Sequence, residues 1–152
     1  MTATFNVLGD EWDGEETRPG YAKRTVALGP RLGATKLGTS LYELPPGQKS
    51  FPHHYELGCE EWAIVVAGRP TLRDPSGERD LGAGDVVCFP DGPAGAHQLH
   101  NRSDENVRVL FVSTKAPVAL VRFPESNKVM LWTQKEGASV VRDEPVEYWE
   151  GE

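Results

Sequence analysis

Imidazole and carboxylate side chains crowd into one short stretch of the chain, "FPHHYELGCEE", at residues 51–61. These side chains are common donors to divalent metal ions, which need several of them around one point. On a β-strand, residues two apart share a face, so His54 and Glu56 point one way while His53 and Tyr55 point the other. If the following strand runs antiparallel, Glu61 returns to meet the first pair. The cluster is equally typical of solvated polar residues ahead of a buried strand.

A second stretch, "GDVVCFPDGPAGAHQLHN" at 84–101, adds a histidine among turn residues. Apart from two extra residues in "GPAGAH", the spacing G-x5-P-x-G-x2-H-x3-N is matched by Gly84, Pro90, Gly92, His97 and Asn101. The first stretch matches the end of the pattern G-x5-H-x-H-x3/4-E-x6-G, because six residues separate Glu61 from Gly68. Together the two stretches resemble the paired motifs of the cupin superfamily. The resemblance covers roughly residues 41–114, and the chain is similar to small single-domain cupins.

This resemblance implies a divalent metal site inside a barrel, with two histidines and a glutamate from the first motif and a histidine from the second. Carried onto this chain, the predicted ligands are His54, Glu56, Glu61 and His97, with Glu56 where the pattern has a histidine. Mn, Fe(II), Ni and Zn all suit such a set. Glu56 and Glu61 are also the predicted catalytic carboxylates. The alternative is a metal-free pocket, in which crowded carboxylates raise one another's pKa and transfer protons.

A second register of the first motif stays open. It begins at His53, which restores the five-residue gap from Gly47, and then places Tyr55 and Glu60 at the next ligand positions. It also breaks the spacing to Gly68, and tyrosine is a poor ligand in this fold. We therefore favour the register that begins at His54.

The elements that position these residues are short and β-rich. Turn signals from 16 Gly and 12 Pro separate nine runs, at 24–28, 36–44, 61–67, 70–73, 85–89, 107–114, 119–123, 129–133 and 139–142. Several runs alternate apolar and polar residues, and no segment shows the 3.6-residue period of a long helix. "RDPSGE" at 73–78 predicts a hairpin turn. The pattern predicts an all-β sandwich or barrel, and the resemblance implies the jelly-roll barrel, a double-stranded β-helix.

We expect one cupin domain over residues 1–152. Its barrel core spans about 36–123, with an N-terminal extension at 1–35 and a C-terminal extension at 124–152. Trp12, Tyr148 and Trp149 are aromatic anchors with which the two extensions pack partly onto the barrel or a partner subunit. The resemblance also implies a homodimer, formed through the N-terminal strands.

Several other residues have a structural interpretation. Trp62 and Cys88 are predicted to be core residues because they lie in apolar runs. Asn101 is expected to hydrogen-bond the backbone at a turn, and His100 to lie at the rim or surface. Tyr42 and Phe51 are predicted to lie either in the wall of the pocket or in the core. Cys59 lies near the site, where exposure to solvent would make it redox-sensitive.

Charge and composition limit the classes of partner that the protein is expected to bind. The 23 acidic residues outnumber the 16 basic ones, so the net charge of −7 disfavours nucleic acid. No run approaches the roughly 18 apolar residues of a membrane span. The N-terminal stretch has no signal-peptide pattern, and two cysteines are too few for a disulfide framework, so we expect a cytoplasmic protein.

Two functions follow from this set of residues. The first is an enzyme that acts on a small polar substrate by metal-assisted oxygenation, isomerisation, decarboxylation or lyase chemistry. The second is a non-catalytic, metal-free module that binds or senses a small ligand, favoured by Glu56 at the histidine position. Fold alone does not decide between them, because this barrel hosts many chemistries.

Overall fold

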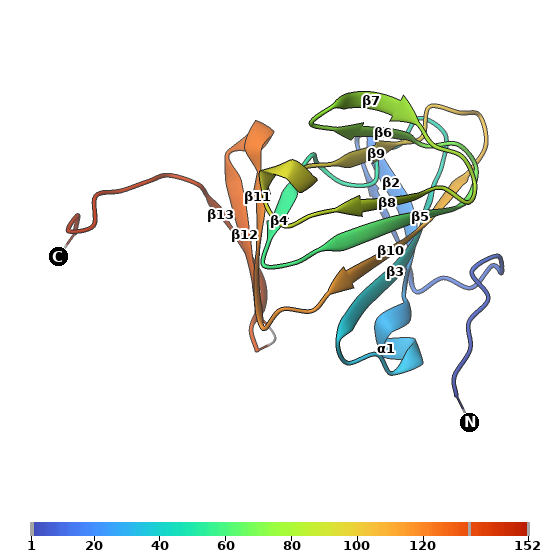
Figure 1. Ribbon diagram of the computed structural model, residues 1–152, viewed down its shortest axis with the longest axis horizontal. Helices are drawn as coiled ribbons and strands as arrows, with labels where there is room; N and C mark the ends of the chain where they lie inside the picture. Colours follow the sequence, from blue (N-terminus) through green and yellow to red (C-terminus); the bar gives the residue numbers. More distant parts are fainter. Residues whose placement is uncertain (1, 134, 152) are drawn as a thin grey trace.

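The computed structural model describes residues 2–133 and 135–151, and its strands form three antiparallel sheets (Figure 1). The largest has six strands, in the order β1 (Gly14–Arg18), β2 (Tyr21–Ala27), β3 (Leu37–Leu44), β10 (Val107–Thr114), β5 (Glu61–Ala67) and β8 (Val86–Phe89). The second has four strands, β13 (Gly137–Arg142), β12 (Lys128–Thr133), β11 (Val118–Phe123) and β4 (Tyr55–Leu57). The third has three strands, β7 (Gly77–Asp80), β6 (Thr71–Asp74) and β9 (Gln98–His100).

Helical structure is limited to short turns, as predicted. They are α1 (Leu28–Leu32) and the 3-10 turns η1 (Pro93–Gly95) and η2 (Pro124–Ser126). Among the described residues, no helix has the length and apolarity needed to cross a membrane. The prediction of an all-β chain is confirmed.

The core lies between the six-stranded and three-stranded sheets. Period-two alternation points Ala63 and Val65 of β5 inward, together with Val109 and Phe111 of β10. They pack with leucines of the smaller sheet, of which Leu72 on β6 is fully buried. The expected runs at 61–67 and 107–114 coincide with β5 and β10, which form the centre of this core.

Four strands were absent from the nine runs that the sequence predicts. Every residue of β1 and β7 is exposed, so neither strand has an apolar alternation to reveal it. The other two, β4 and β9, are only three residues long. Each of these strands depends on a neighbour for its hydrogen bonds, and such pairing leaves little trace in a local pattern.

The core assignments of Trp62 and Cys88 are wrong. Trp62 is 45% exposed and Cys88 is exposed, because both lie on the outer face of the six-stranded sheet. These strands carry apolar residues on both faces, so the apolar run does not reveal which face is buried.

The N-terminal segment covers one half of that outer face. Trp12, Phe5 and Val7 pack against a buried cluster that includes Val26 and Leu41. These contacts place the N-terminal segment against the outer face of the six-stranded sheet. The aromatic residues near the C-terminus are not packed in this way, because Tyr148 and Trp149 are 84% and 75% exposed.

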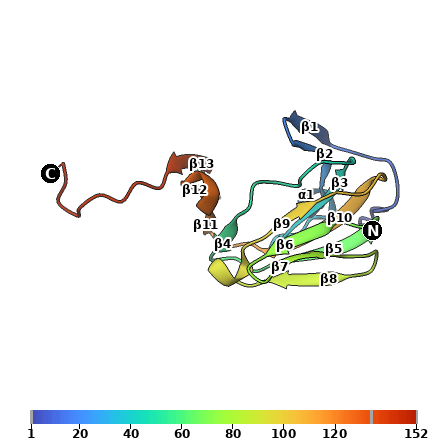
Figure 2. The ribbon, with the colours of Figure 1, turned by 90° about the horizontal axis from the view of Figure 1, so that it is seen from above.

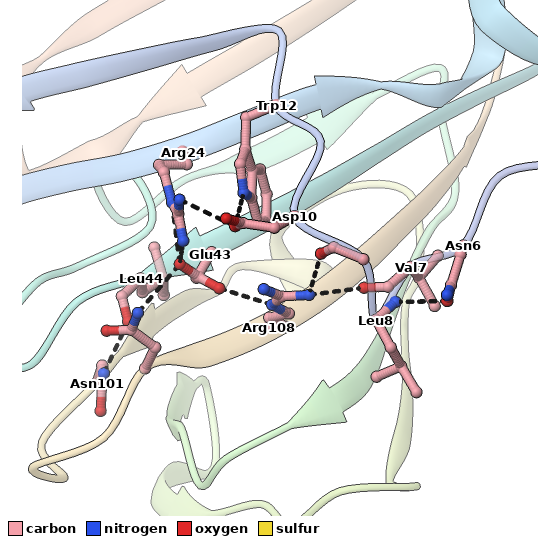
Figure 3. Close-up of polar contacts among 12 residues, drawn as sticks. Asn6, Val7, Leu8, Asp10, Trp12, Arg24, Glu43, Leu44, Asn101 and Arg108 are labelled. Atoms are coloured by element: carbon pink, nitrogen blue, oxygen red, sulfur yellow. Dashed lines mark hydrogen bonds and ion pairs between the residues drawn. The ribbon is translucent and has the colours of Figure 1, made fainter.

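A polar network fastens the N-terminal segment (Figure 3). Glu43 of β3 is buried and stands in register with Arg24 of β2 on one side and Arg108 of β10 on the other. Both guanidiniums donate to its carboxylate, Arg108 Nε at 2.6 Å. Arg108 also donates to the carbonyl oxygens of Val7 and Gly9 at 3.2 and 2.6 Å.

The C-terminal hairpin stands apart from the core. Strand β11 pairs with β4 on one side and with β12 on the other, so β12 and β13 extend a sheet that begins beside the first motif. After β13 the chain runs away from the body as an extended arm, which is seen in both ribbon views (Figures 1 and 2).

Candidate metal centre

Two histidines far apart in sequence face each other across an isolated antiparallel bridge. The backbone N–H of His97 donates to the carbonyl oxygen of His54 at 2.8 Å, and the reverse bond measures 3.2 Å. Their rings lie 4.8 Å apart between centroids. The first motif reaches this bridge just before β4, and the second reaches it just after η1.

The turn that delivers His97 depends on Gly95. A Cβ atom built on Gly95 would lie 2.0 Å from the carbonyl oxygen of Pro90, so no other residue fits without movement of the backbone. Gly92 begins the turn at φ 87°, in the region that favours glycine. The extra residues of "GPAGAH" therefore form a tight 3-10 turn and keep His97 at the bridge.

Glu61 completes a group of three donors. It begins β5, and its Oε2 atom lies 3.1 Å from Nε2 of His97. One ligand atom each from His54, Glu61 and His97 lies within 4.8 Å of the others. Two imidazoles and one carboxylate thus converge on one point inside the barrel.

Both imidazoles present Nε2 to this point. Nδ1 of His54 lies 3.0 Å from the carbonyl oxygen of Pro52, and Nδ1 of His97 lies 2.8 Å from that of Gly95. A carbonyl only accepts, so Nδ1 carries the hydrogen and Nε2 keeps a lone pair. Burial, followed by the neighbouring His97, lowers the pKa of His54 to about 3, which keeps this ring neutral. Neutral imidazole is the form that binds metal.

One buried atom supports the fit of this set to a cation. Among the described residues, Nε2 of His97 has no hydrogen-bond partner, although Glu61 Oε2 is only 3.1 Å away. The two atoms meet the distance of an ion pair but not the geometry of a hydrogen bond. An unpaired buried polar atom is costly, and a cation between the two donors would satisfy both.

Aromatic rings enclose the two histidines. Phe89 stacks on His97 with a centroid distance of 3.6 Å and an interplanar angle of 3°. Phe51 contacts both rings edge-on, at 4.6 Å from His54 and 5.3 Å from His97. Phe123 lies 5.7 Å from His54. These contacts hold the imidazole orientations and limit access of water. Phe51 thus has a wall position at the site, whereas the sequence did not single out Phe89 and Phe123.

Glu56, the fourth predicted ligand, lies beside the group and is not part of it among the described residues. Glu56 lies on β4, opposite Val121 of β11, and it lines a cavity of about 240 Å³. Burial, reinforced by the charge of Glu61, raises the pKa of Glu56 to about 7. Cys59 is buried, so the exposure that would make it redox-sensitive is missing.

The C-terminal sheet supplies a wall that the motifs did not reveal. Met130 and Trp132 of β12 line the Glu56 cavity, opposite Ser113 and Thr114 of β10. In the sequence, Met130 and Trp132 follow Glu56 by more than seventy residues, and no motif spacing connects them to it. Only the pairing of β4 with β11 brings this sheet to the site.

Residues of the alternative register face elsewhere. Burial, followed by the charge of Arg73, lowers the pKa of His53, and Arg73 forms an ion pair with Glu125. Glu60 is exposed and accepts a hydrogen bond from the Trp62 indole at 3.0 Å. Neither residue belongs to the group formed by His54, Glu61 and His97 within the described residues.

The remaining motif residues have structural roles. Asn101 is fully buried and donates to the carbonyl oxygens of Leu44 and Glu105, which confirms its predicted backbone role. His100 is half-buried on β9, where Nε2 lies 3.3 Å from the carbonyl oxygen of Gly47.

The chain is similar to several known proteins. A family model described as "Cupin domain" matches residues 40–113. A solved sugar phosphate isomerase from a cupin superfamily, from Silicibacter pomeroyi DSS-3, is 25% identical, with a TM-score of 0.82, over 96% of this chain and 98% of that chain. A Cupin 2 conserved barrel domain protein from Salinispora arenicola CNS-205 is 31% identical, with a TM-score of 0.53, over 62% of this chain and 76% of that chain.

A protein from Acidithiobacillus ferrooxidans ATCC 23270 is 25% identical, with a TM-score of 0.77, over 88% of this chain and 87% of that chain. No curated protein matches the chain. The matched family region contains both motif stretches and all three converging donors. The predicted jelly-roll fold is confirmed, and the chain belongs to the cupin superfamily as a protein of the cupin-2 type.

Proposed function

We propose that this protein is a divalent-metal-dependent enzyme that acts on a small polar substrate inside the barrel. His54, Glu61 and His97 hold the metal. The observation that carries the proposal is the buried Nε2 of His97, which lies 3.1 Å from Glu61 Oε2 and has no hydrogen-bond partner among the described residues. A structural cluster of the same residues would be expected to satisfy this atom.

The donor set favours Mn, Fe(II), Ni or Zn. Two imidazoles and one carboxylate match the preferences of these ions, and three protein ligands leave positions for a substrate. A metal held there supplies Lewis acidity toward a substrate carbonyl or hydroxyl oxygen. The hydrogen bonds from Nδ1 of His54 and His97 to backbone carbonyls orient the ligands, as in other protein metal sites.

Glu56 is the proton carrier in this proposal. A pKa of about 7 lets its carboxyl group both give and accept a proton near neutral pH. Glu61 assists, because its negative charge contributes to that raised pKa. The cavity beside Glu56 brings a substrate within reach of this carboxyl group, and apolar Met130 and Trp132 limit water there.

Isomerisation is the reaction type that we propose. An aldose–ketose isomerisation moves one proton between neighbouring carbons through an enediol, while a second proton passes from the hydroxyl oxygen to the former carbonyl oxygen. Glu56 would carry the proton between the carbons, and the two adjacent oxygens would exchange the second proton between them. The solved relative from Silicibacter pomeroyi is named a sugar phosphate isomerase and matches nearly the whole chain. This relationship supports a phosphorylated sugar as the substrate class.

Metal binding is tested on protein freed of metal by chelation. Adding Mn, Fe(II), Ni or Zn at about 100 times the dissociation constant should stabilise the wild type by about 2.7 kcal/mol. Glu61→Gln, which keeps the side-chain shape, should lose this stabilisation, and His97→Ala should lose it too. His100→Ala is the matched control and should keep it. Absence of stabilisation by any of the four ions, with substoichiometric metal in purified protein, would favour the metal-free binding module.

Catalysis is tested separately by proton exchange. Incubation with candidate sugar phosphates in D₂O should give deuterium at the carbon next to the carbonyl, observed by NMR. Glu56→Gln should abolish this exchange and keep the metal-induced stabilisation, whereas Glu60→Gln should keep both. Exchange that survives Glu56→Gln would exclude Glu56 as the proton carrier.

A further inference from the structure

The outer face of the six-stranded sheet has one covered half and one open half. The N-terminal segment packs over β2, β3 and part of β10. The other half, over β5 and β8, exposes Trp62 by 45% and Val86 by 53%. A groove of about 220 Å³ runs along this open half, lined by Leu37, Glu60, Trp62, Ile64, Val112, Ser113 and Thr114. Exposed apolar surface of this kind marks an interaction site.

The C-terminal arm, residues 143–151, is the second unpartnered apolar feature. Val146, Tyr148 and Trp149 are 68%, 84% and 75% exposed, and the two aromatic rings contact each other at 4.8 Å. The arm extends away from the body in both ribbon views (Figures 1 and 2). Two large aromatic side chains on one exposed segment are typical of an anchor for another surface.

The charges of the two features are complementary. The arm contains four acidic residues, Asp143, Glu144, Glu147 and Glu150, and no lysine or arginine. Asp143 forms an ion pair with Arg122 of its own chain at 2.8 Å, so the three glutamates carry the charge that the arm offers to a partner. Lys36 and Lys115 are exposed at the end of the groove, where Leu37 pairs with Thr114, and the Lys115 N–H donates to the Lys36 carbonyl oxygen at 3.0 Å. Opposite charges favour encounter in one orientation.

We propose that the arm of one copy docks in the groove of a second copy, and that the exchange is reciprocal. Tyr148 and Trp149 then pack against Trp62 of the other copy, and the arm carboxylates face its two lysines. A two-fold axis makes both contacts identical. Four aromatic side chains would bury roughly 600–1,000 Å² on the arms. The grooves lose a comparable area, so the total reaches the roughly 1,200–2,000 Å² of a stable interface.

Docking there would also affect the cavity of the proposed enzyme. Ser113 and Thr114 line both the groove and the Glu56 cavity. The arm of the second copy therefore lies at the edge of that cavity. The dimer proposal does not depend on the proposed function, because its evidence is the groove, the arm and their charges.

The experiment measures the oligomeric state of the full chain by sedimentation velocity over a concentration series. The wild type should dimerise, and the variants Trp149→Ser and Trp62→Ser should each raise the dissociation constant at least tenfold. Val141→Ser is the matched control, since Val141 is 56% exposed on β13 outside the groove, and should leave the constant unchanged. The double variant Lys36→Glu, Lys115→Glu should weaken the dimer, and adding Glu147→Lys and Glu150→Lys should restore it.

Three outcomes would overturn the proposal. One is a monomeric wild type at every concentration. Another is a dimer that neither tryptophan variant weakens, which would place the interface on another face. The third is a monomer whose arm resists proteolysis until Trp62 is changed, which would mean that the arm docks on its own chain. Circular dichroism of each variant shows whether the fold is kept.

Discussion

Two clusters of buried ionisable side chains lie on opposite faces of the six-stranded sheet, and they differ in how completely their atoms are paired. On the outer face, the Glu43 carboxylate receives hydrogen bonds from Arg24, Arg108 and Asn106. On the inner face, Nε2 of His97 has no hydrogen-bond partner in the described part of the chain. The outer cluster is complete within the chain, whereas the inner one leaves a donor atom for the metal ion that we propose.

The origin of the two clusters explains this difference. The outer cluster arises from strand register, since Glu43 is the direct cross-strand neighbour of both Arg24 and Arg108. The inner cluster brings together three separate segments, at the start of β4, the start of β5 and the end of η1. The outer side chains therefore stabilise the fold, whereas the inner side chains remain available for the chemistry that we propose.

The largest expected effect is on the outer cluster. Glu43→Ala leaves two guanidiniums without their buried anion and removes the fixed position of Arg108, which holds the N-terminal segment. Breaking a buried pair in this way costs about 3–5 kcal/mol of unfolding free energy. Urea denaturation measures the loss. Glu78→Ala, which breaks an exposed pair with Arg102, is the control and should cost far less. Equal losses in the two variants would remove the distinction between the clusters.

The next effect concerns pH and the inner cluster. The pKa of His54 is lowered to about 3, so the folded state excludes its proton and this residue's contribution to stability is lost as pH falls below 6.5. The pKa of Glu56 is raised from 4.5 to about 7, so the folded state retains its proton and stability is lost as pH rises from 4.5 to 7. Between pH 5 and pH 7 each residue contributes about 2 kcal/mol, with opposite signs.

The variant Glu56→Gln separates these two contributions. Relative to the wild type, metal-free Glu56→Gln should gain about 2 kcal/mol of stability as pH rises from 5 to 7. Urea denaturation at pH 5, 6 and 7 gives the difference curve, in which the other titrating groups cancel. Glu60→Gln carries the same change at an exposed neighbour and should follow the wild type. A difference curve without slope would mean that Glu56 is ionised at pH 5 in the folded protein.

The inner cluster could be predicted from the sequence because its residue types and spacings are unusual. Strands β5 and β10 were also predictable, since each is a continuous run rich in β-branched residues. The orientation of Trp62 could not be predicted. Strand β5 has apolar residues on both faces, so their alternation does not show which face is buried. The outer cluster was also missed. Glu43 looks like an ordinary exposed residue of an alternating strand until its cross-strand partners are known.

The displacement of Glu56 from the three converging donors was equally hidden. The motif spacing places it on the same face as His54, but its pairing with Val121 puts its side chain beside a cavity walled by Met130 and Trp132. These residues belong to the C-terminal sheet, whose approach to β4 depends on contacts between distant segments. Local patterns contain no information on such contacts.

The smallest effect is expected for the substitution of Glu56 by the histidine that the family pattern has at this position. Glu56→His removes a carboxyl group whose raised pKa leaves it partly protonated and adds a neutral imidazole beside the three donors. A fourth donor should tighten metal binding roughly tenfold, or about 1.4 kcal/mol, measured by titration of metal-free protein. Glu60→His adds the same ring on the outward side and should leave affinity unchanged. If only the Glu56→His variant binds metal, the native cluster functions without a metal ion, and His97 Nε2 is satisfied by a small ligand instead.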